Sequence, residues 1–530
     1  MELFYSKNAM KAEQFQNSQN PAVNMQQGHI GTLLRQFSID AQQDPNPGTI
    51  DELDLTHIHL GSLNRGIKVK CEFFFQGGRS TGIKPRQVQG NLKNAIFDFG
   101  LELVCHAIYN KDDESDYNAK SEIRIGCIPV MKILWLNAKL GAFGGAEANV
   151  LATARALKAC GWRNELFYLE KTGVAMEAWE EAFSATHCVA GEAEEAQALR
   201  GISADVVWIH NWPESAFFLR LRTLGIPMGR MVHDHALYCM RHYKYHPLTR
   251  KNCTRPASAA CLFPCFAFLQ RGAGGWPVRF ASLSKKLEEI RDNRQLDRVV
   301  VASQFMKGEL LKNGFAESTI RIHPPIPEEP PDQETSPDSA ASGGVPGRIL
   351  FIGQVIRGKG VDLLIRALHG LPGDWHLALA GKGSALAKCQ ALISKLGMGN
   401  RVTFSGHLNP MELSVQYRQA QIVVVPSAWQ EPFGMVGIEA MRHARTVVAF
   451  DVGGIPEWLS DYENGRLVPA GNVEALRDTL RELLDNPAAC RTMGLHGFKK
   501  SASVFSFSHS VHRLQDLLTE LAGAASQPIP

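Results

Sequence analysis

Short apolar runs alternate with amphipathic segments twice along this 530-residue chain, and this alternation limits the fold more than any other feature. The first series has apolar runs at 133–136, 166–169, 206–209, 228–232 and 298–302. The second series has runs at 349–352, 377–380, 402–404, 422–425 and 447–450. Strands that alternate with helices form parallel sheets with helices on both faces. The sequence therefore predicts an α/β fold with two doubly wound, Rossmann-like domains.

Changes in composition mark the boundaries between the parts. A stretch rich in Pro, Glu, Ser and Gly separates the two series at 326–347, which is typical of an acidic linker. We expect a first Rossmann-like domain over 131–325 and a second over 348–505. They would face each other across a cleft between the carboxyl edges of their sheets, where such folds bind ligands. Residues 506–530 are expected to supply a tail and a helix, over 510–521, that returns to the first domain.

Residues 1–130 differ from the rest of the chain, because they are polar, contain none of the nine Trp residues and begin with Asn/Gln-rich sequence. This composition predicts a poorly ordered N-terminal extension. The run after Met131 reads like the first strand of a Rossmann domain at the start of a protein. The upstream segment is thus either genuine or the product of a misassigned start, and the sequence leaves both open. The runs 55–60 and 67–75 could form strands without evident chemistry.

The overall charge gives no reason to expect nucleic acid as a partner. The 56 basic and 53 acidic residues give a net charge of +3, which is close to balance. No apolar run reaches the ~18–20 residues of a membrane span, and no signal peptide is evident. The eleven Cys residues are odd in number and scattered, which indicates reduced thiols. We expect a cytoplasmic protein, with a peripheral position at the inner face of the membrane as a second option.

Two carboxylates, Glu431 and Glu439, lie on either side of a point where a strand is predicted to give way to a helix. Unpaired N–H groups at the start of a helix, here those of Gly434, Met435 and Val436, can hold anionic oxygens. Carboxylates accept hydrogen bonds from sugar hydroxyls. Together these features predict a site for a nucleotide sugar.

A glycine-containing loop follows the first strand of each series. Gly144 and Gly145 would let the backbone approach a diphosphate at the start of a helix, although a plain turn is an equal alternative. Their spacing is not G-x-G-x-x-G, which disfavours a nicotinamide or flavin dinucleotide. In the second loop, Arg357 and Lys359 could neutralise a leaving diphosphate, as a metal ion does in other transferases. A solvated pair of cations is the alternative.

Several of these motifs occur together in one enzyme family. The segments concerned are Gly144 to Glu147, Gly353 to Gly360, Ser427, Glu431 to Gly434, Glu439, Gly453-Gly454 and Asn464-Gly465. The combination, over about residues 131–520, resembles the family 4 retaining glycosyltransferases, also described as glycosyl transferases group 1. It implies the two-domain GT-B fold, a UDP- or GDP-sugar as donor, and neither a cofactor nor a catalytic metal. It also implies transfer, with retention, to a carbohydrate or lipid-linked hydroxyl in glycan, lipid-sugar or exopolysaccharide assembly.

The resemblance implies roles for single residues as well. Glu431 would bond the hydroxyls of the donor sugar, and Glu439 would bond the ribose. The N–H groups at the start of the following helix would face the sugar and the phosphates. Gly144 and Gly145 would abut the diphosphate, and Lys359 would neutralise it. None of these residues is predicted to be a general base, because retaining members are thought to use the donor's leaving phosphate for that purpose.

One position departs from the family pattern. Members usually have Arg directly after the first Gly of the loop, where this chain has Gln354. We hypothesise that Arg357, three residues later, supplies the missing cation. His210 matches in position a histidine that the family places near the sugar, although a lone histidine is more often structural. His233 follows the next strand and could border the same cleft.

The stretch 239–265 contains four cysteines, Cys239, Cys253, Cys261 and Cys265. They could bind Zn²⁺, but no C-x-x-C pair is present and the spacings are loose, so free thiols are favoured. The basic and aromatic residues of this stretch could face anionic lipid, an acidic acceptor or solvent.

Three other functions fit the same two-domain frame. A nucleotide-sugar epimerase or a phosphorylase is disfavoured by the paired glutamates and Lys359. A catalytically inactive sugar-nucleotide binding or scaffold protein is supported only by Gln354 in place of Arg. The sequence names neither the donor base, the sugar and the acceptor nor the oligomeric state.

Overall fold

The computed structural model describes residues 131–524 apart from 142–143, 214, 247–248, 272–277 and 330–343, together with three short N-terminal strands. The chain divides into two units, 1–129 and 130–530. In the first unit, β1 (Ile58–His59) pairs antiparallel with β2 (Val69–Cys71), and β2 pairs parallel with β3 (Ile123–Arg124). β1 and β2 lie in the runs predicted to form strands. The predicted disorder of 1–130 and the question of the start at Met131 lie outside the described residues.

The first sheet of the second unit is parallel, with the strand order β14-β13-β10-β9-β4-β6-β8. Its strands are β4 (Lys132–Leu136), β6 (Arg163–Tyr168), β8 (Ala185–Cys188), β9 (Val206–Ile209), β10 (Met228–Val232), β13 (Arg298–Val301) and β14 (Ile320–Ile322). The helices between them are α4 (Gly145–Ala159), α5 (Met176–Ala182), α6 (Glu192–Arg200), α7 (Ser215–Arg222), α8 (Leu283–Asn293) and α9 (Gln304–Lys312). The sheet grows in opposite directions from β4, so its switch point lies between β4 and β9.

The second sheet is also parallel, with the order β17-β16-β15-β18-β19-β20. Its strands are β15 (Arg348–Ile352), β16 (His376–Ala380), β17 (Val402–Gly406), β18 (Ile422–Val425), β19 (Thr446–Phe450) and β20 (Gly465–Val468). Its helices are α11 (Val361–Leu368), α12 (Leu386–Lys395), α13 (Pro410–Gln419), α14 (Met435–Arg442), α15 (Val473–Leu484) and α16 (Pro487–Val504). The switch point of this sheet lies between β15 and β18, which brings the loops after these strands together.

The prediction of two doubly wound α/β sheets is confirmed. All ten predicted strands form, and β9, β10 and β18 have the predicted bounds. The sequence did not reveal β8, β14 and β20, which are edge strands of the two sheets. Edge strands are short and carry fewer buried apolar residues, so their apolar signal is weak.

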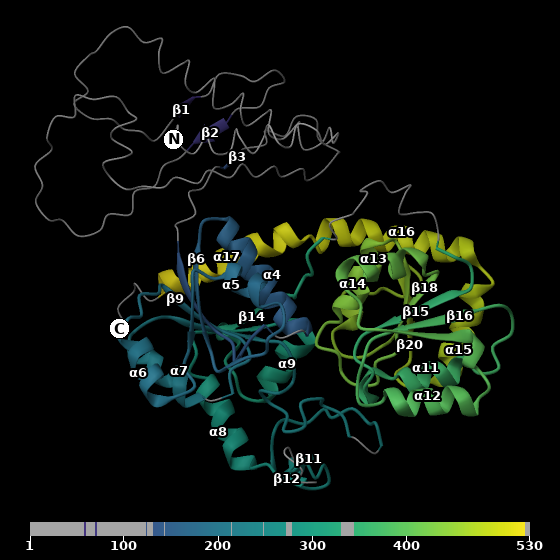
Figure 1. Ribbon diagram of the computed structural model, residues 1–530, viewed down its shortest axis with the longest axis horizontal. Coiled ribbons are helices and arrows are strands. Elements are labelled where there is room, and N and C mark those ends of the chain that lie inside the picture. Colours follow the sequence, from purple (N-terminus) through teal and green to yellow (C-terminus); the bar gives the residue numbers. More distant parts are fainter. Residues whose placement is uncertain are drawn as a thin grey trace, which may run out of the picture. The chain divides into compact units, whose positions relative to one another are not determined.

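Helix α17 (Phe507–Ala524) is longer than the helix expected over 510–521 and packs on the first sheet, although it follows the second sheet in sequence (Figure 1). The Glu520 carboxylate pairs with Arg298 and Arg321, at 2.8 Å from each. The Leu521 side chain lies over Gly229 of β10, where an added Cβ would come within 2.9 Å of it. Helix α17 therefore completes the layers of the first domain.

An insertion, residues 239–282, separates β10 from α8. It contains the antiparallel hairpin of β11 (Leu269–Arg271) and β12 (Val278–Phe280). The Lys244 ammonium lies 2.7 Å from the Glu309 carboxylate of α9, and both side chains are almost fully buried. The Arg250 guanidinium lies 2.7 Å from the Asp362 carboxylate of α11. The insertion is therefore anchored to both domains.

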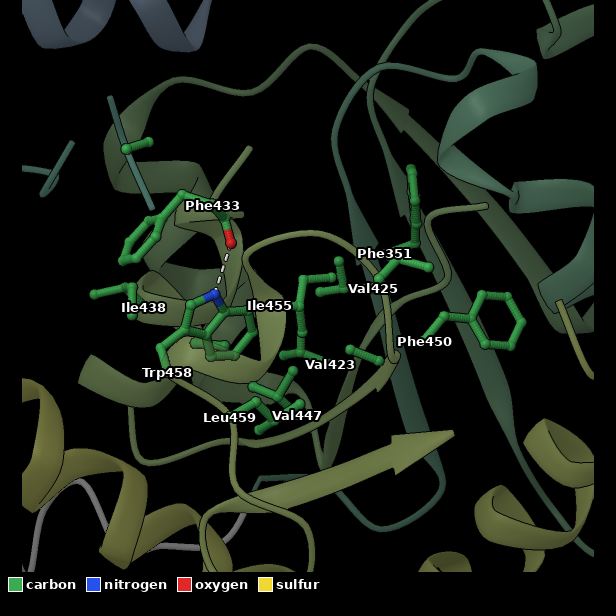
Figure 2. Close-up of a cluster of buried hydrophobic side chains, with 14 of the residues drawn as sticks. Phe351, Val423, Val425, Phe433, Ile438, Val447, Phe450, Ile455, Trp458 and Leu459 are labelled. Carbon is green, nitrogen blue, oxygen red and sulfur yellow. Dashed lines mark hydrogen bonds between the residues drawn. The ribbon is translucent and has the colours of Figure 1, made fainter. Parts of the chain in front are cut away.

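Trp458 lies in the cluster of buried apolar side chains beneath the loop after β18, next to Ile438, Ile455 and Leu459 (Figure 2). Its indole N–H donates to the Phe433 carbonyl oxygen at 2.6 Å, and its side chain is fully buried. A Cβ added at Gly437 in α14 would lie 2.0 Å from the Trp458 ring. Gly437 is thus the residue that allows α14 to lie directly on Trp458.

We expect Gly437→Ala to lower the free energy of unfolding by about 1–3 kcal/mol, because the added methyl group must displace the buried indole. Chemical denaturation would measure the change. The control is Gly308→Ala in α9, where no atom lies within 4 Å of the added Cβ. That variant should be neutral or slightly stabilising, because Ala favours the helix. Equal effects of the two substitutions would contradict the packing argument.

Candidate functional site

The loops after β15 and β18 are bonded to each other along their backbones. The N–H groups of Ala428 and Trp429 donate to the Gly358 carbonyl oxygen, at 2.8 and 3.2 Å. Gly360 has a φ of +68°, and a Cβ added there would lie 1.8 Å from the Pro426 carbonyl oxygen. Only glycine allows this approach, so the sequence places Lys359, one residue earlier, beside the loop that follows β18.

Lys359 and Glu431 form an ion pair at this junction. The Lys359 ammonium lies 2.5 Å from Glu431 Oε1, and only 3% of Glu431 is exposed. The same oxygen accepts hydrogen bonds from the Ser427 hydroxyl and, at 2.9 Å, from the Trp429 indole N–H. The ammonium also lies 5.3 Å from the centroid of the Trp429 ring, within cation–π range. The carboxylate is therefore fixed in one orientation.

Burial alone would raise the pKa of the Glu431 carboxyl. The Lys359 charge and the hydrogen bonds from Lys359, Ser427 and Trp429 outweigh burial and hold that pKa below its ordinary value. Glu431 is thus ionised at neutral pH and suited to accept hydrogen bonds rather than to donate a proton.

Glu439 lies in a different environment, on α14. Its Oε2 accepts a hydrogen bond from the Tyr417 hydroxyl at 2.6 Å, and the Tyr417 ring stacks on His443 at 4.9 Å between centroids. Burial raises the pKa of the Glu439 carboxyl, and the bond from Tyr417 offsets this only in part. The two carboxylates named from the sequence therefore have pKa values shifted in opposite directions.

The starts of α4 and α14 face each other where the two domains meet. Gly144 and Gly434 are the residues that precede these helices, and Gly434 has a φ of +95°. A Cβ added at Gly145 would lie 2.7 Å from the Met435 Cε atom. Both helices thus direct the partial positive charge of their N-termini, which includes the Met435 and Val436 N–H groups, toward one region. Such a region favours an anionic ligand.

The turn after β19 packs directly against the backbone of Glu431. The Gly454 N–H donates to the Glu431 carbonyl oxygen at 2.8 Å. A Cβ added at Gly453 would lie 2.1 Å from the same oxygen. The paired glycines therefore fix the main chain on which the site carboxylate is carried.

His210 lies at the carboxyl end of β9 and is paired with His233. Its Nδ1 lies 2.7 Å from His233 Nε2, and its ring stacks on Trp135 with 5.2 Å between centroids. His210 Nε2 is buried without a hydrogen-bond partner among the described residues. Burial lowers the pKa of His210 well below its ordinary value and, partly offset by Asp234, lowers the pKa of His233 to about 4. Both rings are therefore neutral at pH 7.

Three side-chain contacts hold the 430–432 backbone and its surroundings against the first domain. His235 Nε2 lies 2.6 Å from the Gln430 carbonyl oxygen, and the Ser303 hydroxyl donates to the Pro432 carbonyl oxygen at 2.6 Å. The Glu457 carboxylate of the second domain accepts the N–H groups of Gln304 and Phe305 at the start of α9, at 2.9 and 3.0 Å. A carboxylate at a helix N-terminus is stabilised by the helix dipole.

Gln354 and Arg357 lie on the exposed side of the loop that carries Lys359. The Arg357 charge acts on Tyr245 of the insertion, where it opposes the rise in the pKa of Tyr245 that burial causes. Gln354 likewise is not part of the buried cluster around Glu431.

Sequence reasoning missed the contacts of three side chains that shape the site, Trp429, Tyr417 and Glu457. Trp429 had a local signal, because an indole donor two residues before Glu431 in the same loop can reach its carboxylate. Tyr417 and Glu457 had none, because each reaches its partner only through the tertiary fold.

Among the described residues, no group of three His, Cys, Asp or Glu side chains is arranged to hold a metal ion. Cys239, Cys253, Cys261 and Cys265 are free cysteines, each partly exposed.

Comparison with known proteins gives the family of the second domain. Residues 332–500 match the family model of glycosyl transferases group 1. The D-inositol 3-phosphate glycosyltransferase of Mycolicibacterium smegmatis is 31% identical over 229 residues, which cover 42% of this chain and 52% of that protein. The chain thus spans about half the length of this relative. The MMP alpha-(1->4)-mannosyltransferase of Mycolicibacterium hassiacum is 27% identical over 317 residues, 59% of this chain and 70% of that protein.

Solved structures extend the similarity of fold to both domains. Anabaena HepE in complex with UDP and glucose aligns with a TM-score of 0.57 at 17% identity, over 74% of this chain and 100% of HepE. Sucrose-phosphate synthase of Thermosynechococcus elongatus aligns with a TM-score of 0.57 at 20% identity, with the same coverage. The GT-B fold predicted from the sequence is confirmed, and residues 332–500 match the predicted family.

We expect the folded protein to lose stability as the pH falls from about 7.5 to 5. His233 has a lowered pKa in the folded state, about 4, so the unfolded chain binds more protons below about pH 6.5. The decrease in the free energy of unfolding that His233 causes should reach about 2 kcal/mol at pH 5. Denaturant unfolding at several pH values would measure it.

The matched variants are His233→Gln and His496→Gln. His496 is exposed, and its substitution should leave the pH dependence as in the parent protein. His233→Gln should be less stable at neutral pH, and its stability should vary less between pH 7.5 and 5. A pH profile that does not change with His233→Gln would show that this histidine is not responsible.

Proposed function

We propose, from the premise that residues 332–500 belong to the glycosyl transferases group 1 family, that this protein is a retaining, metal-independent glycosyltransferase. It would move a sugar from a UDP- or GDP-sugar to a hydroxyl of a carbohydrate or lipid-linked acceptor, in glycan, lipid-sugar or exopolysaccharide assembly. We place it in the cytoplasm. The observation that carries the proposal is the Lys359–Glu431 pair, held at the switch point of the second sheet.

The nucleoside diphosphate is the group that this region suits best. The starts of α4 and α14 offer backbone N–H groups, and Lys359 adds a full positive charge. As the bond between C1 of the sugar and the diphosphate oxygen breaks, negative charge grows on the leaving diphosphate. Fixed positive groups stabilise this charge without reorganisation. Lys359 would provide this stabilisation, with Gly144 and Gly145 against the diphosphate.

The sugar would be held by Glu431 and His210. Glu431 is ionised and oriented, so it can accept bonds from sugar hydroxyls in the manner of a binding group. His210 Nε2 is a buried nitrogen without a hydrogen-bond partner in the part of the chain that the structure describes, and its other nitrogen is fixed by His233. A hydroxyl of the donor would satisfy it. Glu439 would bond the ribose, next to the start of α14.

The transfer step can be written without a protein nucleophile. The acceptor oxygen forms its bond to C1 on the face from which the diphosphate leaves, and the configuration is retained. The acceptor proton passes to an oxygen of the departing phosphate, so no general base of the protein is needed. The complexes of HepE with UDP and with UDP-glucose favour uridine over guanosine as the base of the donor.

A screen of nucleotide sugars tests the proposal first. A UDP- or GDP-sugar should raise the midpoint of thermal unfolding, because a ligand that binds only the folded state stabilises it. Purified protein should then hydrolyse or transfer the sugar. Binding of UDP or GDP with no turnover of any donor would support the inactive scaffold instead.

Lys359→Met and Glu431→Gln should each lower kcat/KM by about 100- to 1000-fold, because each removes a charge from the site. Steady-state kinetics with the donor found in the screen would measure the loss. Lys388→Gln, an exposed lysine on α12, is the control and should keep the parent kcat/KM. Full activity of Lys359→Met would exclude the proposed role of the ammonium.

Arg357→Ala tests whether this residue replaces the arginine that the family carries at the position of Gln354. The loss of a cation at the leaving group should lower kcat/KM by a factor that corresponds to about 2–4 kcal/mol. Gln354→Arg in the Arg357→Ala background should recover part of it. Unchanged kcat/KM in Arg357→Ala would rule this role out.

A further inference from the structure

The insertion between β10 and α8 is strongly basic together with the start of α8. Residues 239–287 contain nine Lys and Arg residues and neither Asp nor Glu. Three of the nine are paired with carboxylates elsewhere, in the pairs Lys244–Glu309, Arg250–Asp362 and Lys286–Glu289. Lys251, Arg255, Arg279 and Lys285 are exposed, and none of them has a carboxylate partner among the described residues. The nearest carboxylates along the chain, Glu288 and Glu289, pair with Arg291 and Lys286, so these four exposed cations leave this part of the surface with an excess of positive charge.

The same insertion carries a cluster of aromatic side chains, in which Phe263, Phe266 and Phe280 are exposed and Phe268 is partly buried. Phe263 and Phe280 are 71% and 76% exposed, the highest values among the exposed large apolar residues that the structure describes. The rings follow one another in contact, at 5.2 Å from Phe263 to Phe266, 6.4 Å to Phe268 and 6.5 Å to Phe280. A contiguous exposed group of this kind usually marks an interaction site.

The phenylalanine cluster is held in place by the protein and is not a set of loose side chains. The Arg241 guanidinium donates to the Cys265 and Phe266 carbonyl oxygens at 2.9 and 2.7 Å. The Gln270 side chain donates to the Met240 carbonyl oxygen at 2.7 Å and accepts from Arg279 at 2.6 Å. The buried Lys244–Glu309 pair fixes the base of the insertion to α9. The exposed rings are thus presented on an anchored support.

We propose that the phenylalanine cluster and the cations around it dock onto an anionic lipid bilayer. Exposed aromatic rings are stable at the boundary between head groups and acyl chains, and Lys and Arg side chains pair with acidic head groups. A second copy of this chain is a poorer occupant, because a twofold contact through the patch would bring together two surfaces with an excess of positive charge. A protein partner would need pockets shaped for the two protruding rings, whereas lipid accepts them without such pockets.

Docking through the insertion would also hold the candidate site close to the bilayer surface. The insertion reaches the loop after β18, where the Tyr243 ring lies 5.4 Å from the Trp429 ring. It also reaches α11 through Arg250. The bilayer contact would be peripheral, because no helix in the described part of the chain is long and apolar enough to span a membrane. Binding to lipid can be measured without turnover, so this proposal stands or falls independently of the proposed transfer reaction.

The test is cosedimentation of the full chain with vesicles. Vesicles with about 30 mol% phosphatidylglycerol in phosphatidylcholine should bind the protein, and vesicles of phosphatidylcholine alone should bind it at least about tenfold more weakly. Raising the salt concentration to about 0.5 M should weaken the binding several-fold, because it screens the charges. Absence of binding to the anionic vesicles, or equal binding to both kinds, would overturn the proposal.

Two double variants separate the contributions, each with a matched control. Phe263→Ser with Phe280→Ser should weaken binding about tenfold or more, whereas Met411→Ser, 49% exposed on α13, should not. Arg279→Gln with Lys285→Gln should weaken it to a similar extent, whereas Lys388→Gln with Lys395→Gln on α12 should not. All four residues of the docking variants are exposed, and circular dichroism would check that the fold is kept.

Equal effects of the docking variants and their controls would overturn the assignment of the surface. The assignment would also be overturned if the parent protein self-associates and the double variant Phe263→Ser with Phe280→Ser does not. The patch would then be a contact between copies of the chain.

Discussion

The contact between Lys359 and Glu431 is the interaction around which the second domain is arranged. Removing a carboxylate from water is costly, and here the cost is offset by three donors on a single oxygen. The donors come from two loops that adjoin only because β15 and β18 are neighbours at the switch point of the sheet. The order of the strands therefore brings the two charges together, and the ion pair in turn stabilises the contact between the two loops.

The glycines of this region follow from the same constraint. Gly360 and Gly453 lie where a neighbouring carbonyl oxygen leaves no room for a side chain, and Gly437 lies where Trp458 leaves none. Gly360 and Gly453 allow loops to approach the backbone that carries Ser427, Trp429 and Glu431, and Gly437 allows α14 to approach Trp458. These glycines thus allow the close packing that brings the polar groups of the site within hydrogen-bond distance. This structural role does not depend on whether the glycines also contact a ligand.

The sequence predicted those parts of the fold that have a strong local signal. Buried strands such as 422–425 are continuous β-branched runs, and their order of appearance implied the parallel sheets. The edge strand β8 has the sequence Ala-Thr-His-Cys, with two exposed residues, and carries no such signal. Of the site, the sequence placed Lys359 and Glu431 in loops that follow predicted strands, and the structure brings these two loops together. The Tyr417–Glu439 bond and the contact of Glu457 with α9 were not predicted, because no motif marks either pair and each forms only in the tertiary fold.

The contact between the domains must hold the backbone of the site in place and must also leave space for a ligand. The contacts of His235 with Gln430 and of Ser303 with Pro432 hold the domains together, and Met435 lies against Gly145 at the start of α4. A diphosphate bound between the two helix starts would need the space that the Met435 side chain now takes. Met435 is flexible and only partly buried, so its side chain can rotate away without breaking those two bonds. The backbone that carries Glu431 can therefore stay fixed while the space beside it opens for a ligand.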